Sequence, residues 1–445
     1  MTTGAQRADS GRPAPSGGTP PDPDRAGASG SAPAGERHGG AEPGTDASRP
    51  RPADSGAADG VLRPAPGRPG RAEAHLAAPA VQNHAANLTV LPGGDLGCVW
   101  FAGTLEGVAD ISVWFSRLAP GADTWSTPVR LTDDPTRSEQ NPLLFAAPSG
   151  ELWLLHTAQL GGRQETAEVR LRVSDDDGAT WGPSRTLFEG GVFVRQPVVE
   201  LPGSGRLLLP VFHCTTPPGT PWTGDRDTSA VLISDDGGRT WHERPVPGST
   251  GLVHMNIRRL PDGSLLALFR SRRADAVHRS TSYDGGETWT VPEPTELPNN
   301  NSSVQYAVLA DGRLALTYNH SSAADATERR VSLYDDIDDG DLNGDGSEGP
   351  AAAPSGDAFW GAPRAPLSLA VSADGGHTWP LRHDLETGDG HCLTNNSRDG
   401  LNRELSYPTL AQTPDGALHI AYTHHRRTIK HISLSPSWTA RAFPA

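Results

Sequence analysis

The chain has 445 residues, a formal net charge of −15, 51 glycines, 41 prolines and 11 tryptophans. A phosphate backbone repels so acidic a protein, which argues against nucleic acid as a partner. No run of about 18 apolar residues is present, so the sequence predicts no membrane span. The three cysteines, Cys98, Cys214 and Cys392, show neither a metal-ligand spacing nor a disulfide framework. We therefore expect no metal and no cofactor.

The N-terminal segment, residues 1–79, consists of Gly, Pro, Ala, Ser, Arg and Asp with almost no large apolar side chain. Such a segment cannot bury enough surface to offset the entropy lost on ordering. We predict that residues 1–79 are disordered and that the folded domain covers residues 80–445. No apolar stretch follows Met1, so no secretory signal is visible and the chain as written predicts a cytoplasmic protein.

Six copies of one pattern follow, each an apolar alternating run, a glycine turn and a second apolar run. They begin at Asn87, Asn141, Gln196, Asn256, Val304 and Tyr407. The Asp-Gly turns supply the positive φ that a tight hairpin needs. A third apolar run and a short fourth strand complete each copy. Six copies of four strands predict an all-β, six-bladed β-propeller.

Four of the third runs end in a box of the form Ser-x-Asp-x-Gly-x-Thr-Trp, and these boxes begin at Ser174, Ser234, Ser282 and Ser372. The Asp side chain can accept backbone N–H bonds in a turn, the Gly can take a left-handed φ, and the Trp can fold back on the blade. We interpret the box as a folding device and not as catalytic residues. An insertion rich in Asp, Gly and Ala, at about 322–363, separates the last two boxes.

In a propeller, the first strand of each blade begins and the second ends at the same mouth of the central channel. Side chains at these positions therefore converge on one face, where binding and catalytic residues usually lie. Here these positions are rich in Arg, His, Tyr and amide side chains, which predicts a ligand site. The candidates are Asn141, Arg195, His254, Asn301, Glu404 and Tyr407 before first strands, and Glu106, Asp110, Arg270, Arg272, Asn319, Arg426 and Arg427 after second strands.

The boxes and the hairpins between them resemble the sialidase (neuraminidase) superfamily, and in particular its BNR-repeat, sialidase-like branch. The resemblance covers about Gln82 to Trp438. It implies a sialidase-like β-propeller that acts on an acidic carbohydrate as a monomer, and not at a membrane. The implied reaction is exo-hydrolysis of a terminal sialic acid or related carboxylated sugar. In this chemistry arginines bind the carboxylate, a tyrosine is the nucleophile, a carboxylate takes its proton, and an aspartate is the general acid/base.

By blade position the resemblance places Tyr407, in LSYP, as the nucleophile and Arg270, in LFRSR, as one carboxylate-binding arginine. Asp110, in the TLEGVAD loop, matches the acid/base, with Glu106 as its competitor. Glu404, three residues before Tyr407, is a candidate local carboxylate.

The chain also departs from the family pattern. Blade 1 begins with NHAANL, without the expected arginine, and TYNHSS in blade 5 lacks another. His254 stands near the position of the carboxylate that partners the tyrosine. Candidate replacements for the missing arginines are Arg195, Arg272, Arg426 and Arg427, and the candidate binding amides are Asn141, Asn301 and Asn319.

Two alternatives to hydrolysis stay open. A pair of His254 and Tyr407 with a charge-neutralising arginine fits a polysaccharide lyase acting on uronate-containing glycans. A non-catalytic glycan-binding propeller fits the same surface. The run Asp341–Gly346 spells the first half of a calcium loop, but Ala352 stands where the loop needs Glu, so we predict no calcium site there.

Overall fold

A computed structural model of the protein describes residues 57–444 except 218–219, 221, 331 and 335–355. All described residues belong to one compact unit, Asp54–Ala445. Within it, a one-turn 3₁₀ helix at Ala323–Asp325 and helix α1 (Pro436–Ala442) accompany 26 strands. None of the described helices is long and apolar enough to cross a membrane. The candidate calcium loop at 341–346 lies outside the described residues.

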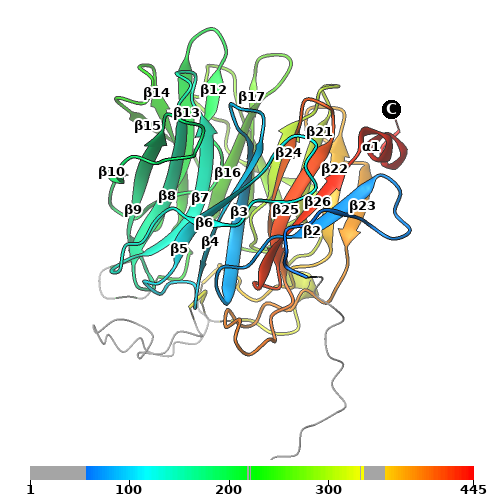
Figure 1. Ribbon diagram of the computed structural model, residues 1–445. Coiled ribbons are helices and arrows are strands. Elements are labelled where there is room, and N and C mark those ends of the chain that lie inside the picture. The colour runs from blue at the N-terminus through cyan, green and yellow to red at the C-terminus, as the bar shows by residue number, and fades with distance from the viewer. Residues whose placement is uncertain (1–56, 218–219, 221, 331, 335–355, 445) are drawn as a thin grey trace, which may run out of the picture. The chain divides into compact units, whose positions relative to one another are not determined.

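Six antiparallel sheets form the blades of a β-propeller (Figure 1), as predicted. Blade 1 contains β3 (Gln82–Val90), β4 (Leu96–Gly103), β5 (Ser112–Leu118) and β6 (Val129–Arg130). Blade 2 contains β7 (Ser138–Ala146), β8 (Leu152–Leu160), β9 (Arg163–Ser174) and β10 (Arg185–Phe188). Blade 3 contains β11 (Val192–Val194), β12 (Val199–Leu201), β13 (Arg206–His213), β14 (Thr228–Ser234) and β15 (His242–Pro245).

The other three blades repeat this order. Blade 4 contains β16 (Leu252–Arg259), β17 (Leu265–Ser271), β18 (Ala276–Ser282) and β19 (Glu293–Pro298). Blade 5 contains β20 (Gln305–Val308), β21 (Leu314–Asn319), β22 (Leu367–Ser372) and β23 (Leu381–Glu386). Blade 6 contains β24 (Leu405–Gln412), β25 (Leu418–His424) and β26 (Thr428–Leu434), and its outer strands are β2 (Arg71–His75) and β1 (Arg63–Pro64).

The outer strands of blade 6 correct the predicted domain boundary at residue 80. Strand β2 pairs with β26 over five residues, so the N-terminal part of the folded unit closes the ring. Residues 57–79 therefore belong to the propeller, whereas residues 1–56 lie outside the described part of the chain. Charge holds β2 in place, because Arg71 binds Glu73 and Glu386, and Lys430 binds the same two carboxylates at 2.8 and 2.7 Å.

Each Asp box closes a turn with a network of short hydrogen bonds. In the blade 4 box, Ser282 Oγ donates to Asp284 and accepts from the backbone N–H of Gly286, both at 2.9 Å. Asp284 also accepts from the backbone N–H and the hydroxyl of Thr288. Trp289 is buried and packs among the apolar side chains between blades 3 and 4. The contacts made by this box are thus internal to the fold.

Replacing Ser282 by Ala should lower the free energy of unfolding by about 1 to 3 kcal/mol, because the buried N–H of Gly286 loses its acceptor. Urea unfolding followed by tryptophan fluorescence measures this loss. Ser184→Ala is the matched control, since Ser184 is exposed between β9 and β10, and it should change stability by less than about 0.5 kcal/mol. Equal stability of the two variants would contradict the folding role of the box.

Candidate functional site

The innermost strands carry a bulge near the channel mouth in four blades. The strand pairing shifts register around Ala85, Asn141, His254 and Tyr407, which have φ values of 61, 49, 54 and 52°. A bulge re-aims a side chain, and a positive φ is uncommon for residues other than Gly. Asn301, just before β20, has a φ of 57°. A positive φ at a residue other than glycine thus recurs at the start of five blades.

Tyr407 lies at the centre of a group of buried arginines. Its Oη accepts a hydrogen bond of 2.5 Å from Nη1 of Arg270. The guanidinium carbons of Arg195, Arg270 and Arg364 lie 5.2, 5.5 and 5.7 Å from the centroid of the tyrosine ring. All three arginines are buried, and Tyr407 is 6% exposed. Blades 3, 4 and 6 and the segment that leads into β22 of blade 5 therefore meet at one tyrosine.

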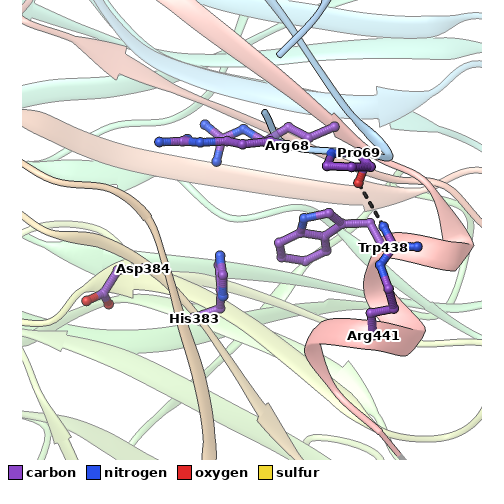
Figure 2. Close-up of a pocket in the computed structure, with 7 residues that line it drawn as sticks. Arg68, Pro69, His383, Asp384, Trp438 and Arg441 are labelled. Atoms are coloured by element: carbon purple, nitrogen blue, oxygen red, sulfur yellow. Dashed lines mark hydrogen bonds between the residues drawn. The ribbon is translucent and has the colours of Figure 1, made fainter. Parts of the chain in front are cut away.

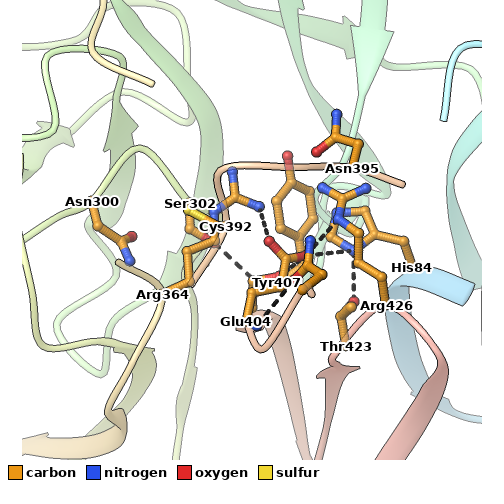
Figure 3. Close-up of polar contacts among 12 residues, drawn as sticks. His84, Asn300, Ser302, Arg364, Cys392, Asn395, Glu404, Tyr407, Thr423 and Arg426 are labelled. Carbon is orange, nitrogen blue, oxygen red and sulfur yellow. Dashed lines mark hydrogen bonds and ion pairs between the residues drawn. The ribbon is translucent and has the colours of Figure 1, made fainter. Parts of the chain in front are cut away.

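Two of the arginines near Tyr407 are neutralised by buried carboxylates (Figure 3). Glu404 accepts from Arg364 at 2.9 Å and pairs with Nε of Arg426 at 2.7 Å. Arg426 also donates to Glu106, from the loop after β4. Burial raises the pKa of Glu404, but Arg426 and Arg364 outweigh that effect and hold the pKa below its usual range. The ion pairs thus link two arginines and two carboxylates in the order Arg364, Glu404, Arg426 and Glu106.

Arg195 and Arg270 differ, because their contacts in the described structure include no carboxylate. Arg195 donates to the carbonyl oxygens of Ala85, Ala86 and Tyr407. Arg270 donates to Tyr407 and to the amide oxygen of Asn301. Burial lowers the pKa of Arg195 to about 10 and that of Arg270 to about 9, so both stay charged at neutral pH. Buried cations without an anionic partner are costly and favour the binding of an anion.

Two histidines flank the ring of Tyr407. The ring centroids of His84 and His254 lie 4.3 and 5.6 Å from its centroid. Burial and the surrounding arginines hold the pKa of both imidazoles well below the usual value, so both are neutral at pH 7. Nε2 of His84 and Nδ1 of His254 have no hydrogen-bond partner among the described residues. Both histidines therefore have a ring nitrogen to offer to a ligand or to a proton.

The loop that carries Asp110 also reaches Tyr407. Ile111 packs with Ala85, Phe101 and Tyr407 in one buried cluster. Asp110 itself is exposed, and its carboxylate accepts from the backbone N–H of Thr104 within the same loop. The sequence-predicted aspartate and tyrosine thus come from adjoining segments, without a direct contact between their side chains.

Arg272, predicted to bind the substrate, is paired with a buried carboxylate of the protein. It binds the fully buried Asp227 at 2.7 and 2.9 Å, and the rings of Trp222 and Trp360 lie 5.2 Å from its guanidinium carbon. Trp360 also lies 5.8 Å from Arg270 and comes from the described end of the predicted insertion. Arg272 is therefore a support for the wall that these tryptophans form beside Arg270.

The other residues predicted to bind substrate lie at different positions in the blades. Asn301 connects Arg270 to the backbone of Phe359, and Asn319 donates to the carbonyl oxygen of Leu405, two residues before Tyr407. Asn141 is a buried bulge residue in blade 2. Arg427 turns away from the network and donates to Gly400.

Sequence reasoning did not find the role of Arg364. It lies just before β22, at the start of a third strand, whereas the predicted site residues lie at the starts of first strands and the ends of second strands. The buried pairing of Arg364 with Glu404 has no local sequence signal beyond a charged residue in the apolar stretch GAPRAPL.

Six blades with repeated Asp boxes around a buried tyrosine and arginines define a sialidase-like β-propeller. The chain belongs to the BNR repeat-like domain family, whose sequence profile matches residues 94–420. It is 27% identical over 176 residues to the anhydrosialidase of Macrobdella decora, a match that covers 36% of this chain and 22% of that protein.

Solved structures share the fold at low identity. A Hadza microbial sialidase matches with a TM-score of 0.59 and 16% identity, over 80% of this chain and 66% of that one. The intramolecular trans-sialidase of Ruminococcus gnavus, in complex with oseltamivir carboxylate, matches with a TM-score of 0.58 and 13% identity, over 86% of this chain and 99% of that one.

Proposed function

We propose that the protein is a glycoside hydrolase that releases a terminal carboxylated sugar, sialic acid or a related acid, from a glycan. One observation carries the proposal: Arg195 and Arg270, both charged and buried, have no carboxylate partner among the described residues and lie against Tyr407. A substrate carboxylate would supply the missing negative charge through forked hydrogen bonds. The names of the similar proteins, which are sialidases, support the same class of substrate.

In the proposed reaction Oη of Tyr407 attacks the anomeric carbon, and the glycosidic C–O bond breaks. The leaving oxygen takes a proton from a general acid, and water then releases the sugar from the tyrosine. Asp110 is the proposed acid, because Glu106 is committed to its ion pair with Arg426. Arg364, Arg426 and Glu404 position the site from blades 5 and 6.

The proton of Tyr407 needs an acceptor. Oη accepts from Arg270, and the carboxylate of Glu404 is bound to two arginines and a serine. The neutral rings of His254 and His84 are adjacent and carry free ring nitrogens within the described structure. We propose His254 as the acceptor, in the place where the family resemblance implies a carboxylate.

A screen of synthetic acidic glycosides and polyuronates tests the proposed function. Hydrolysis predicts release of a free carboxylated sugar, detected by chromatography, with no product that absorbs in the ultraviolet. Saturable binding of these glycans without any turnover would indicate a non-catalytic glycan-binding propeller and overturn the enzymatic proposal.

Neutral His254 beside Tyr407 also favours a second candidate, a uronate lyase. There His254 would remove the proton α to the carboxylate, Tyr407 would protonate the leaving oxygen, and arginine would stabilise the carboxylate-derived anion. His254→Asn tests both, because Asn tolerates the left-handed backbone of this bulge. Either reaction should lose about 10²- to 10⁴-fold in turnover. An ultraviolet-absorbing unsaturated product would decide for the lyase, and unchanged turnover would exclude His254 from the proton transfer.

A further inference from the structure

A polar pocket of about 320 Å³ opens between the outer strands of blades 5 and 6, away from Tyr407 (Figure 2). Arg68 and Arg71 from the β1–β2 region, His383 and Asp384 from β23, and Trp438 and Arg441 from α1 line it. It shares no lining residue with the Tyr407 site. The two also lie at opposite edges of blade 6, since Arg426 precedes β26 and α1 follows the other end of that strand.

The arginines around this pocket differ in how many of their N–H groups are already hydrogen-bonded. Arg71 is buried, and its guanidinium donates hydrogen bonds to Glu73, Glu386 and the carbonyl oxygen of Leu385. The side chain of Arg68 is 53% exposed, and its Nη1 donates to the carbonyl oxygen of Leu385 at 3.3 Å and lies 3.9 Å from Glu73. Arg441 is exposed, and its Nη2 donates to the carbonyl oxygen of Pro69. Arg68 and Arg441 therefore keep N–H groups for an anion, in a protein whose net charge is −15.

The other walls suit a hydroxylated ring. Trp438 packs into the core with Phe443, which fixes its indole at the side of the pocket, and His383 packs edge-on to it at 5.0 Å. The carboxylate of Asp384 lies on the other face of β23, where Oδ1 contacts Ser368 and Arg382. Arginine donors beside an aromatic wall in one small cavity are the features of a site for a polar ring with one negative charge.

We propose that this pocket binds a carboxylated sugar, with the carboxylate on Arg68 and Arg441 and the ring against Trp438. The inference does not depend on turnover at Tyr407. A second site of this kind would keep the protein attached to an acidic glycan while a chain end occupies the channel mouth, which raises the effective concentration of substrate.

Calorimetric titration of the full chain with N-acetylneuraminic acid and with glucuronic acid tests the proposal. The double variant Arg68→Gln/Arg441→Gln should have one binding site fewer than the wild type, or bind at that site about 10-fold or more weakly. The substitutions are at exposed side chains, and circular dichroism verifies the fold. Arg185→Gln, at an exposed arginine on β10, controls for the loss of a positive charge from the surface and should keep every site.

An unchanged number of sites and unchanged affinity in the double variant would overturn the proposal. Equal or tighter binding of inorganic phosphate or of neutral glucose at the site would also overturn it, since the pocket would then not select a carboxylated sugar. Absence of turnover on every acidic glycoside, with the site at Arg68 and Arg441 intact, would count against the proposed hydrolase alone.

Discussion

Replacing Tyr407 by Phe is expected to lower turnover of a susceptible acidic glycoside by about 10³-fold or more, because the variant has no nucleophilic oxygen. The ring would keep its packing against Ala85, Phe101 and Ile111. Only the hydrogen bond from Arg270 would be lost, and because a buried charged donor then has no acceptor at that position, stability should fall by about 1 to 3 kcal/mol. Initial rates and urea unfolding on the same preparation separate the two effects.

Tyr306→Phe is the matched control for this experiment. Tyr306 is a fully buried tyrosine on another innermost strand, β20, and its hydroxyl donates to the carbonyl oxygen of Leu266 at 2.6 Å. Its loss should cost a similar amount of stability with turnover unchanged. A covalent tyrosine intermediate also predicts a product with retained anomeric configuration, visible by NMR immediately after release. Wild-type turnover in Tyr407→Phe would refute the nucleophile assignment.

The fold could be predicted from sequence because each blade repeats the same local sequence pattern. Hairpin turns at fixed offsets and Asp boxes such as Ser282–Trp289 are local, so they can be recognised without tertiary context. Strand β2, RAEAH, offers no such signal: its buried apolar side chain is Ala74, and ion pairs at the far end of the chain hold it in place. The sequence-predicted boundary at residue 80 was wrong for that reason.

The site could be predicted only as far as strand ends define it. The starts of first strands and the ends of second strands include Tyr407, Arg270 and Glu404, which the structure brings together. Strand position could not separate an arginine that keeps a free charge, such as Arg195, from one that a carboxylate neutralises, such as Arg272. That difference is set by side chains from other blades and loops, and a single sequence does not record such pairings.

Glu404→Gln is the second substitution for which we expect a large effect, because it removes a buried negative charge. Glu404 is 1% exposed and is the one carboxylate that the described residues give to Arg364, while Arg426 would retain Glu106. Removing one partner of a buried ion pair leaves an uncompensated charge, so the free energy of unfolding should fall by about 3 to 5 kcal/mol at pH 7. The Michaelis constant for an acidic substrate should also change, because two arginines beside Tyr407 lose their common anchor.

The pH dependence of that loss separates charge from packing. The lowered pKa of Glu404 means that its contribution is complete above the ordinary value of 4.5 and disappears as the pH falls through the folded-state pKa. The deficit of Glu404→Gln should therefore be full at pH 7 and shrink in acid. Glu139→Gln is the matched control: burial raises the pKa of Glu139, so removing that charge should cost little. A deficit of equal size at all pH values, or one shared by Glu139→Gln, would assign the effect of Glu404 to packing.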